Sequence, residues 1–161
     1  MKTDKYVFFW NGIYSQWYPS PVVIDGMEFN CMEQWMMWNK AKLFEDDEVA
    51  DLIMSTLRPS KQKELGRTVI GFNKEKWDAV AYDIVVKGNY EKFTQHKDLQ
   101  EELLKTKDSI LVEASPYDTI WGIGMGKNSP GIENEKNWKG LNLLGKAITE
   151  VKKRIQNERH G

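Results

Sequence analysis

Two apolar segments near the N-terminus have the residue types of β-strands. Residues 6–10 (YVFFW) form an aromatic run that ends at Asn11-Gly12. Residues 21–24 (PVVI) and 27–29 (MEF) flank Asp25-Gly26, a dipeptide typical of a two-residue hairpin turn of type I′. We therefore predict a strand over 6–10 and a β-hairpin over 21–29.

The next pattern predicts a central helix over residues 31–44. Asn30 is a candidate N-cap, and Glu33 follows three positions later as the partner in a capping box. The stretch WMMW at 35–38 places methionines on one face of this helix and tryptophans on another. A helix that is apolar on two sides is expected to lie between other elements rather than at the surface.

Helical periodicity dominates the rest of the chain. Short helices are predicted at 46–54, 59–66 and 98–105, a long one from Asn73 to about Phe93, and a terminal one at 141–156. Residues 109–114 (SILVEA) predict a buried strand, and 116–139 a long glycine-rich loop of the kind that is more often functional than ornamental. With no linker or repeat, we expect a single compact α+β domain over 1–161, dominated by helices.

Composition narrows the class of protein. The single cysteine, Cys31, excludes an intramolecular disulfide, and two histidines leave little material for a metal site. No apolar run approaches the roughly 20 residues of a membrane span, and the N-terminus lacks the layout of a signal peptide. We expect a soluble cytoplasmic protein without a bound metal. A net charge of −1 provides no basic footprint for lasting nonspecific DNA binding.

Glu33 and Lys40 are the sharpest candidate pair. Their spacing of seven residues places them within about 20° of each other on the predicted helix and roughly 10 Å apart along its axis. One interpretation is a capping glutamate and a lysine whose amine reaches water. The other is a carboxylate and an amine that border a pocket, where burial shifts their pKa values. Periodicity alone leaves both interpretations open.

The glycine-rich loop contains GIGMGK at 122–127, which does not match a known phosphate loop. A Walker A motif needs glycine where Trp121 stands and Ser or Thr where Asn128 stands. The spacing also differs from the dinucleotide fingerprint. Loop amides and Lys127 could contact a phosphate, or the glycines could serve only flexibility. Asp118, after the predicted buried strand, is either a polar site residue or a turn aspartate.

Taken together, these segments resemble the NADAR (YbiA-like) domain family. The resemblance lies in SQWYPSP at 15–21, EQWMMWNKA at 33–41, LGR at 65–67, Trp77, KF at 92–93, DTIWG at 118–122 and GLNLLG at 140–145. It runs in order from about residue 8 to 154. Two departures stand out. Gln16 occupies a position where the family usually has Asn, and Trp35 and Trp38 occupy positions where Tyr is commoner.

The resemblance implies a compact α+β fold and a hydrolase that cleaves the N-glycosidic bond between ribose C1′ and an amino-bearing base, without a cofactor. Two substrate classes are associated with such proteins: guanine carrying ADP-ribose on nucleic acid, and the phosphoribosylamino-pyrimidine intermediates of riboflavin synthesis. We favour removal of ADP-ribose from guanine in DNA, because the chain has no companion domain for riboflavin synthesis. The low net charge argues against stable sequence-specific DNA binding without excluding DNA as substrate.

The family's functional positions are carried over onto residues of this chain. The family's pocket maps onto Glu33, Lys40, Arg67, Trp77, Asp118 and Trp121. We expect catalytic roles for Glu33, Lys40 and Asp118, and substrate-binding roles for Gln16, Trp35, Arg67, Trp77, Trp121, Lys127 and Asn142, with Lys127 of the glycine-rich loop as a candidate for a second phosphate. Among these, Trp77 and Trp121 are expected to stack on the base and Arg67 to bind a phosphate. Trp10, Trp17 and Trp138 are expected to be framework residues.

The shared aminoriboside chemistry suggests a mechanism. Lys40, with a pKa lowered by burial, would attack C1′ of a ring-opened imine, while Glu33 or Asp118 transfers protons. Alternatively, a carboxylate activates water and Lys40 only orients the ribose. An alternative of another class is a noncatalytic sensor of ADP-ribose or a related nucleotide. The presence of Glu33, Lys40 and Asp118 together favours an enzyme. The sequence predicts no oligomeric state.

Overall fold

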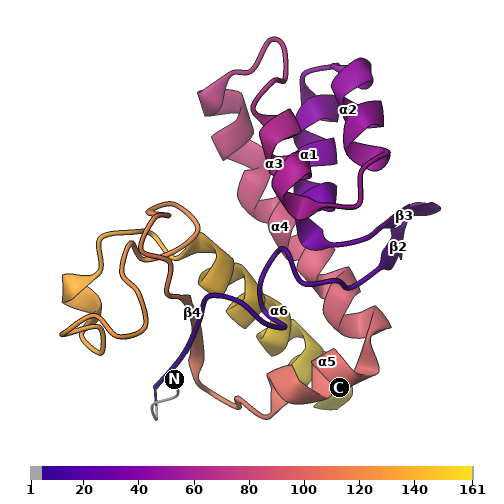
Figure 1. Ribbon diagram of the computed structural model, residues 1–161. Coiled ribbons are helices and arrows are strands. Elements are labelled where there is room, and N and C mark those ends of the chain that lie inside the picture. Colours follow the sequence, from indigo (N-terminus) through magenta and orange to yellow (C-terminus); the bar gives the residue numbers. More distant parts are fainter. Residues whose placement is uncertain (1–4, 161) are drawn as a thin grey trace. The chain divides into compact units, whose positions relative to one another are not determined.

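The computed structural model describes residues 5–160 and divides them into two compact units (Figure 1). The central unit comprises Gln16–Gln95, and the terminal unit comprises residues 5–15 and 96–160. Within the described residues there are six α-helices and two two-stranded sheets. This confirms an α+β fold dominated by helices, whereas a single domain over the whole chain stays a prediction.

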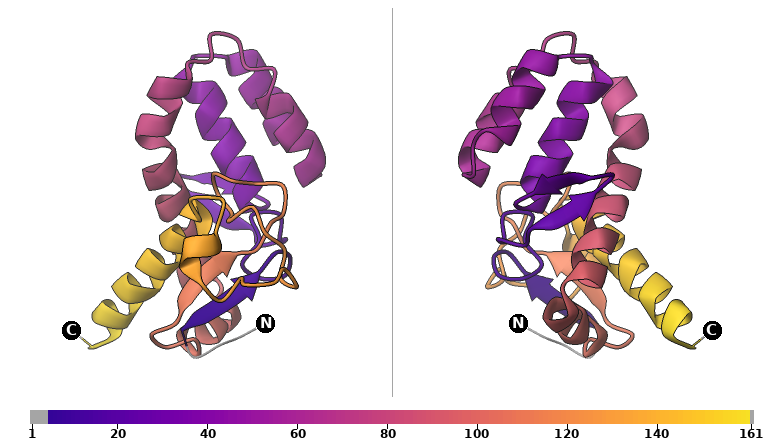
Figure 2. Two further views of the ribbon diagram at one scale, coloured as in Figure 1. Left: turned by 90° about the vertical axis from the view of Figure 1, so that its left-hand side faces the viewer. Right: turned by 90° about the vertical axis from the view of Figure 1, so that its right-hand side faces the viewer.

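Four helices build the central unit: α1 (Met32–Leu43), α2 (Asp47–Met54), α3 (Pro59–Gly66) and α4 (Lys74–Gln95). Helix α1 packs against the other three and lies between α4 on one side and α2 and α3 on the other (Figure 2). The predicted central position of this helix is therefore confirmed.

Local chemistry explains where these helices begin. The Asp46 carboxylate accepts a hydrogen bond from the backbone N–H of Val49 at 3.2 Å and caps α2. Pro59 occupies the first turn of α3, where its missing N–H costs nothing. Asn73 accepts from the N–H of Lys76 at 3.0 Å at the start of α4. All three starts agree with the predicted helix boundaries.

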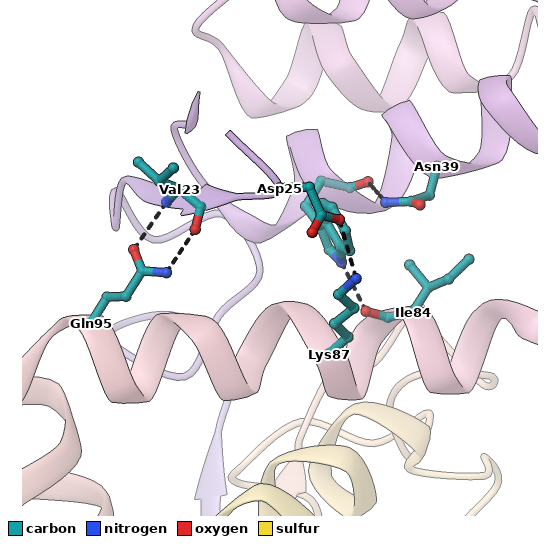
Figure 3. Close-up of polar contacts among 7 residues, drawn as sticks. Val23, Asp25, Asn39, Ile84, Lys87 and Gln95 are labelled. Atoms are coloured by element: carbon teal, nitrogen blue, oxygen red, sulfur yellow. Dashed lines mark hydrogen bonds and ion pairs between the residues drawn. The ribbon is translucent and has the colours of Figure 1, made fainter. Parts of the chain in front are cut away.

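The predicted hairpin is present and is anchored to α4. Strands β2 (Val22–Ile24) and β3 (Met27–Phe29) pair antiparallel, and the turn residues Asp25 and Gly26 have φ angles of 52° and 81°, as a type I′ turn requires. Gln95 of α4 forms two hydrogen bonds with the backbone of Val23, at 2.9 and 2.8 Å (Figure 3). Lys87 pairs with Asp25 at 3.3 Å.

Trp35 fills the contact between α1 and α4. Its indole N–H donates to the carbonyl of Ile84 at 2.8 Å, and its ring packs edge-on against Phe29 with centroids 5.0 Å apart. Gly88 makes this close approach possible, because a Cβ there would lie 2.4 Å from Cδ1 of Trp35. The tryptophan is thereby fixed in the core of the central unit.

In the terminal unit, β1 (Tyr6–Phe9) pairs in parallel with β4 (Ile110–Glu113). Helix α6 (Leu143–His160) packs on β4 and on α5 (Lys97–Leu104). The core of this unit includes Tyr6, Phe8, Val112, Ala114 and Ile123. The segment 116–139 contains only the short 3-10 helix η1 (Glu135–Asn137), so the predicted long loop is confirmed. Helix α6 extends four residues beyond the predicted end.

Candidate active site

Glu33 lies in the first turn of α1 and is only 8% exposed. Its backbone N–H donates to the carbonyl of Gln16 at 2.9 Å. Its Oε1 accepts a hydrogen bond from the indole N–H of Trp17 at 3.0 Å. The carboxylate is thus held by a residue of the preceding loop.

The predicted capping box of α1 is wrong. The N-cap is Cys31, whose side chain makes no cap bond, and Gln34 rather than Glu33 accepts from the N–H of Asn30, at 2.7 Å. The Asn30 side chain instead donates to the carbonyl of Leu57 at 2.6 Å. A tertiary contact therefore outcompetes the predicted local cap.

Lys40 is half-buried on α1, and its Nζ lies 4.6 Å from the ring centroid of Phe72. Desolvation lowers the pKa of Lys40; the charge of Glu33 opposes this effect, and the charge of Arg67 adds to it. A lowered pKa is what the predicted nucleophilic role needs, because it increases the fraction of neutral amine.

The loop that follows α3 supplies Phe72 and Arg67. Asp46 holds this loop by accepting from the N–H of Ile70 at 2.8 Å, and Phe44 packs edge-on against Phe72 with centroids 5.4 Å apart. Arg67 is the C-cap residue of α3 and is exposed. An exposed guanidinium near a half-buried amine suits the expected phosphate contact.

The side chain of Gln16 is committed within the central unit. Its Oε1 accepts from Nδ2 of Asn89 at 3.1 Å, and its Nε2 lies 3.7 Å from Sδ of Met36. The fully buried Asn89 Oδ1 finds no hydrogen-bond partner within residues 5–160. The predicted substrate contact of Gln16 would therefore require its side chain to exchange partners.

Two tryptophans predicted to bind substrate have little free surface. Trp77 is 7% exposed, and Trp35 is buried with its N–H bonded to Ile84. Rings in this position stabilise the central unit. Stacking against a base requires an accessible face, so the binding roles of Trp35 and Trp77 stay predictions.

Sequence reasoning missed Lys92, a fully buried lysine of α4. Its Nζ lies 5.7 Å from the ring centroid of Tyr18, and burial lowers its pKa to about 7. The neighbouring Cys31 thiol is also buried, which raises its pKa to about 11. A lysine in a helix usually indicates a solvated face, so the helical pattern did not predict that Lys92 is buried. The only feature of the sequence that marked this residue was the Lys92-Phe93 pair of the family resemblance.

Trp17 and Phe72 were also missed as site residues. Trp17 was expected to be framework, yet it donates to Glu33. It belongs to the segment 15–21 that carries part of the resemblance, so its neighbourhood could have been flagged. Phe72 follows a turn glycine, and no pattern in the sequence connects it with Lys40.

The remaining predicted residues lie in the terminal unit. Asp118 Oδ1 accepts from the N–H groups of Ile120 and Trp121, at 2.9 and 2.8 Å, as a turn aspartate does. Asn142 is buried and bonds to the backbone of β4 through both side-chain polar atoms. Trp121 and Lys127 are partly exposed. The catalytic and binding roles of these four stay predictions.

A hollow of the terminal unit is lined by Lys5, Tyr6 and residues 133–136, none of which is a predicted site residue. Within residues 5–160, no group of three His, Cys, Asp or Glu side chains converges. No described helix is long and apolar enough to cross a membrane.

Known proteins similar to this chain support the resemblance. A protein of Acanthamoeba polyphaga mimivirus named as an N-glycosidase is 41% identical, with 97% of this chain and 99% of that protein covered. An N-glycosidase of Nostoc punctiforme is 32% identical, with 91% and 86% covered. The NMR structure of Escherichia coli YbiA superposes with a TM-score of 0.80 at 24% identity, over 99% of this chain and 89% of that one, and supports the fold.

The model of the NADAR domain matches residues 8–156. These bounds agree closely with the span of about 8 to 154 over which the sequence motifs occur in order. Because the match covers nearly the whole chain, this chain belongs to the NADAR domain family.

Proposed function

We propose that this chain removes ADP-ribose from guanine in DNA by hydrolysing the bond between ribose C1′ and the exocyclic amine of the base. The broader class, an enzyme acting on N-glycosyl bonds, follows from family membership and from relatives named as N-glycosidases. The substrate and the residue roles are our proposal.

The observation that carries the proposal is the position of Lys40 and Glu33 on the same helix, where the charge of Glu33 acts on the amine. Both side chains project from α1, the lysine is half-buried, and desolvation lowers its pKa. A neutral amine is a nucleophile, whereas an ammonium group is not. Glu33, nearly enclosed and held by Trp17, supplies a carboxylate on the same helix.

The proposed reaction begins with the ribose attached to an exocyclic nitrogen. Proton transfer to the ring oxygen opens the ribose and forms an imine between C1′ and that nitrogen. The lone pair of Lys40 Nζ adds to C1′, and a proton passes from Nζ to the base nitrogen. The bond from C1′ to the base nitrogen then breaks while Glu33 carries the second proton of Nζ to that nitrogen, which releases guanine with its amine restored and leaves a neutral imine between C1′ and Lys40.

Water completes the cycle. It adds to C1′ of the lysine imine, the bond between C1′ and Nζ breaks, and free ADP-ribose leaves with an aldehyde that closes to the ring. One water is consumed overall, as hydrolysis requires. Glu33 accepts and returns the protons in these steps, and we assign to the exposed guanidinium of Arg67 the contact with a phosphate of the ADP-ribose.

The test is a release assay with ADP-ribosylated guanine DNA and the ribosylamino-pyrimidine phosphate as parallel substrates. We expect ADP-ribose release from DNA, loss of about 10²–10⁴-fold in rate for K40A, and a borohydride-reduced adduct on Lys40. The control K42A removes an exposed lysine of the same helix that pairs with Asp47 and should retain activity.

Each other outcome identifies an alternative. Release from the pyrimidine substrate alone would replace the DNA substrate with a riboflavin intermediate. Binding of ADP-ribose without release from either substrate would indicate a sensor module. Full activity of K40A together with no reduced adduct would eliminate the covalent mechanism.

A further inference from the structure

Trp17 makes a contact with Glu33 that its surface position does not require. The ring is 45% exposed, yet its N–H points inward and donates to Oε1 of Glu33, which is 8% exposed, at 3.0 Å. A half-exposed indole could satisfy its single donor with water. The hydrogen bond to a nearly buried carboxylate therefore calls for an explanation.

The backbone around Trp17 is fixed to the same helix. The carbonyl of Gln16 accepts from the N–H of Glu33 at 2.9 Å, and the side chain of Gln16 accepts from Asn89 of α4 at 3.1 Å. The loop is thus tied to α1 and α4 immediately before Trp17. Because the backbone before Trp17 is held in this way, the indole has a defined orientation toward the carboxylate of Glu33.

We propose that Trp17 is a positioning residue that holds the carboxylate of Glu33 for proton transfer, an inference that rests on the proposed function of Glu33. Indole is a donor only, so Trp17 can neither accept a proton from Glu33 nor pass one on. It fixes one oxygen, and because a carboxylate is planar, it also sets the direction of the other. The donated hydrogen bond stabilises the ionised form.

Other charges around Glu33 come from α1, α3 and α4. Lys40 lies on the same helix and interacts with Glu33, Arg67 at the end of α3 acts on Lys40, and Lys92 of α4 acts on Cys31 at the N-terminus of α1. Substitution of Trp17 by phenylalanine leaves these groups in place and keeps an aromatic ring. W17F therefore reports mainly on the lost N–H.

The decisive experiment combines a carboxyl titration with kinetics. Carbon-13 NMR of labelled glutamate, with the Glu33 signal identified by its loss in E33Q, should show a higher pKa of Glu33 in W17F than in the original chain. In the release assay, the acid limb of the kcat profile should move to higher pH and kcat should fall about tenfold, the scale of one hydrogen bond to a charged group. KM should stay within about twofold.

The matched control is W10F, because Trp10 is 49% exposed and lies outside the central unit. It should leave both the Glu33 titration and the kinetics unchanged. An unaltered Glu33 titration in W17F, or a change confined to KM, would overturn the proposal. If the original chain releases neither product, the proposed function fails, while the titration still decides whether Trp17 holds Glu33.

Discussion

Replacing the buried Lys92 by methionine should change how protein stability depends on pH between pH 7 and 9. In the folded chain, burial lowers the pKa of Lys92 from 10.5 to about 7. Between these two values the unfolded chain binds the proton and the folded chain releases it. Stability therefore rises with pH across this window, by up to about 1.4 kcal/mol per pH unit.

The magnitude follows from the two pKa values. Lys92 is about half protonated in the folded chain at pH 7 and almost fully neutral at pH 9. Raising the pH over this range should add about 2 kcal/mol to the free energy of unfolding. For a chain of this length that corresponds to roughly 4–8 °C in Tm. K92M should lack this increment.

Other buried groups do not obscure the comparison. The pKa of Lys152 is lowered by burial to about 8, but its contribution is present in both proteins. Burial raises the pKa of Cys31 to about 11 and of Tyr14 to about 12, so these groups reduce stability only as the pH passes their unfolded values of 9.0 and 10.0. Among these buried groups, therefore, only Lys92 and Lys152 contribute to the pH dependence of stability between pH 7 and 9.

The assay is urea unfolding, followed by circular dichroism at intervals across the window. The control is K87M, on the same helix, where an exposed lysine pairs with Asp25 and the ion pair contributes about 0–1 kcal/mol. K87M should keep the original pH dependence. If K92M keeps it too, the reasoning about Lys92 is refuted.

Two further predictions concern packing and the amine. G88A places a Cβ 2.4 Å from Trp35, and this overpacking of about 1–3 kcal/mol, reduced by a gain of about 1 kcal/mol in helix propensity, should lower Tm. The control G126A, where an added Cβ has no atom within 4 Å, should keep the original Tm. Equal Tm values for G88A and the original chain would contradict the close contact. F72L keeps apolar bulk but loses the ring face against Lys40. Loss of a cation–π interaction of roughly 0.5–1 kcal/mol, which stabilises the charged amine, should lower the pKa of Lys40 further. A kcat/KM profile that does not move would exclude that interaction.

Features determined by neighbouring residues could be predicted from the sequence. Asp25-Gly26 specifies its turn because only a few residue types tolerate two successive positive φ angles. The cap by Asp46 and the proline at the start of α3 likewise act within one helical turn. In each case the partners are adjacent in the chain, so the pattern contains the information.

Contacts between distant residues decided the rest. Asn30 lost its predicted cap to Leu57, 27 residues away. Trp17 contacts Glu33, which is 16 residues further along the chain. Phe72, in the loop after α3, contacts Lys40 of α1. The residue types at the candidate site indicate the chemistry they can perform. Periodicity, however, does not predict which aromatic ring contacts which charged side chain.

The two hydrogen bonds between Gln95 and Val23 also bear on self-association. A two-stranded sheet exposes backbone N–H and C=O groups at its edge, and such groups can recruit a strand from another chain. The amide of Gln95 bonds both groups of Val23, much as a further strand would. The hairpin edge is thereby covered by a side chain of its own unit, which protects the protein from aggregation through β2.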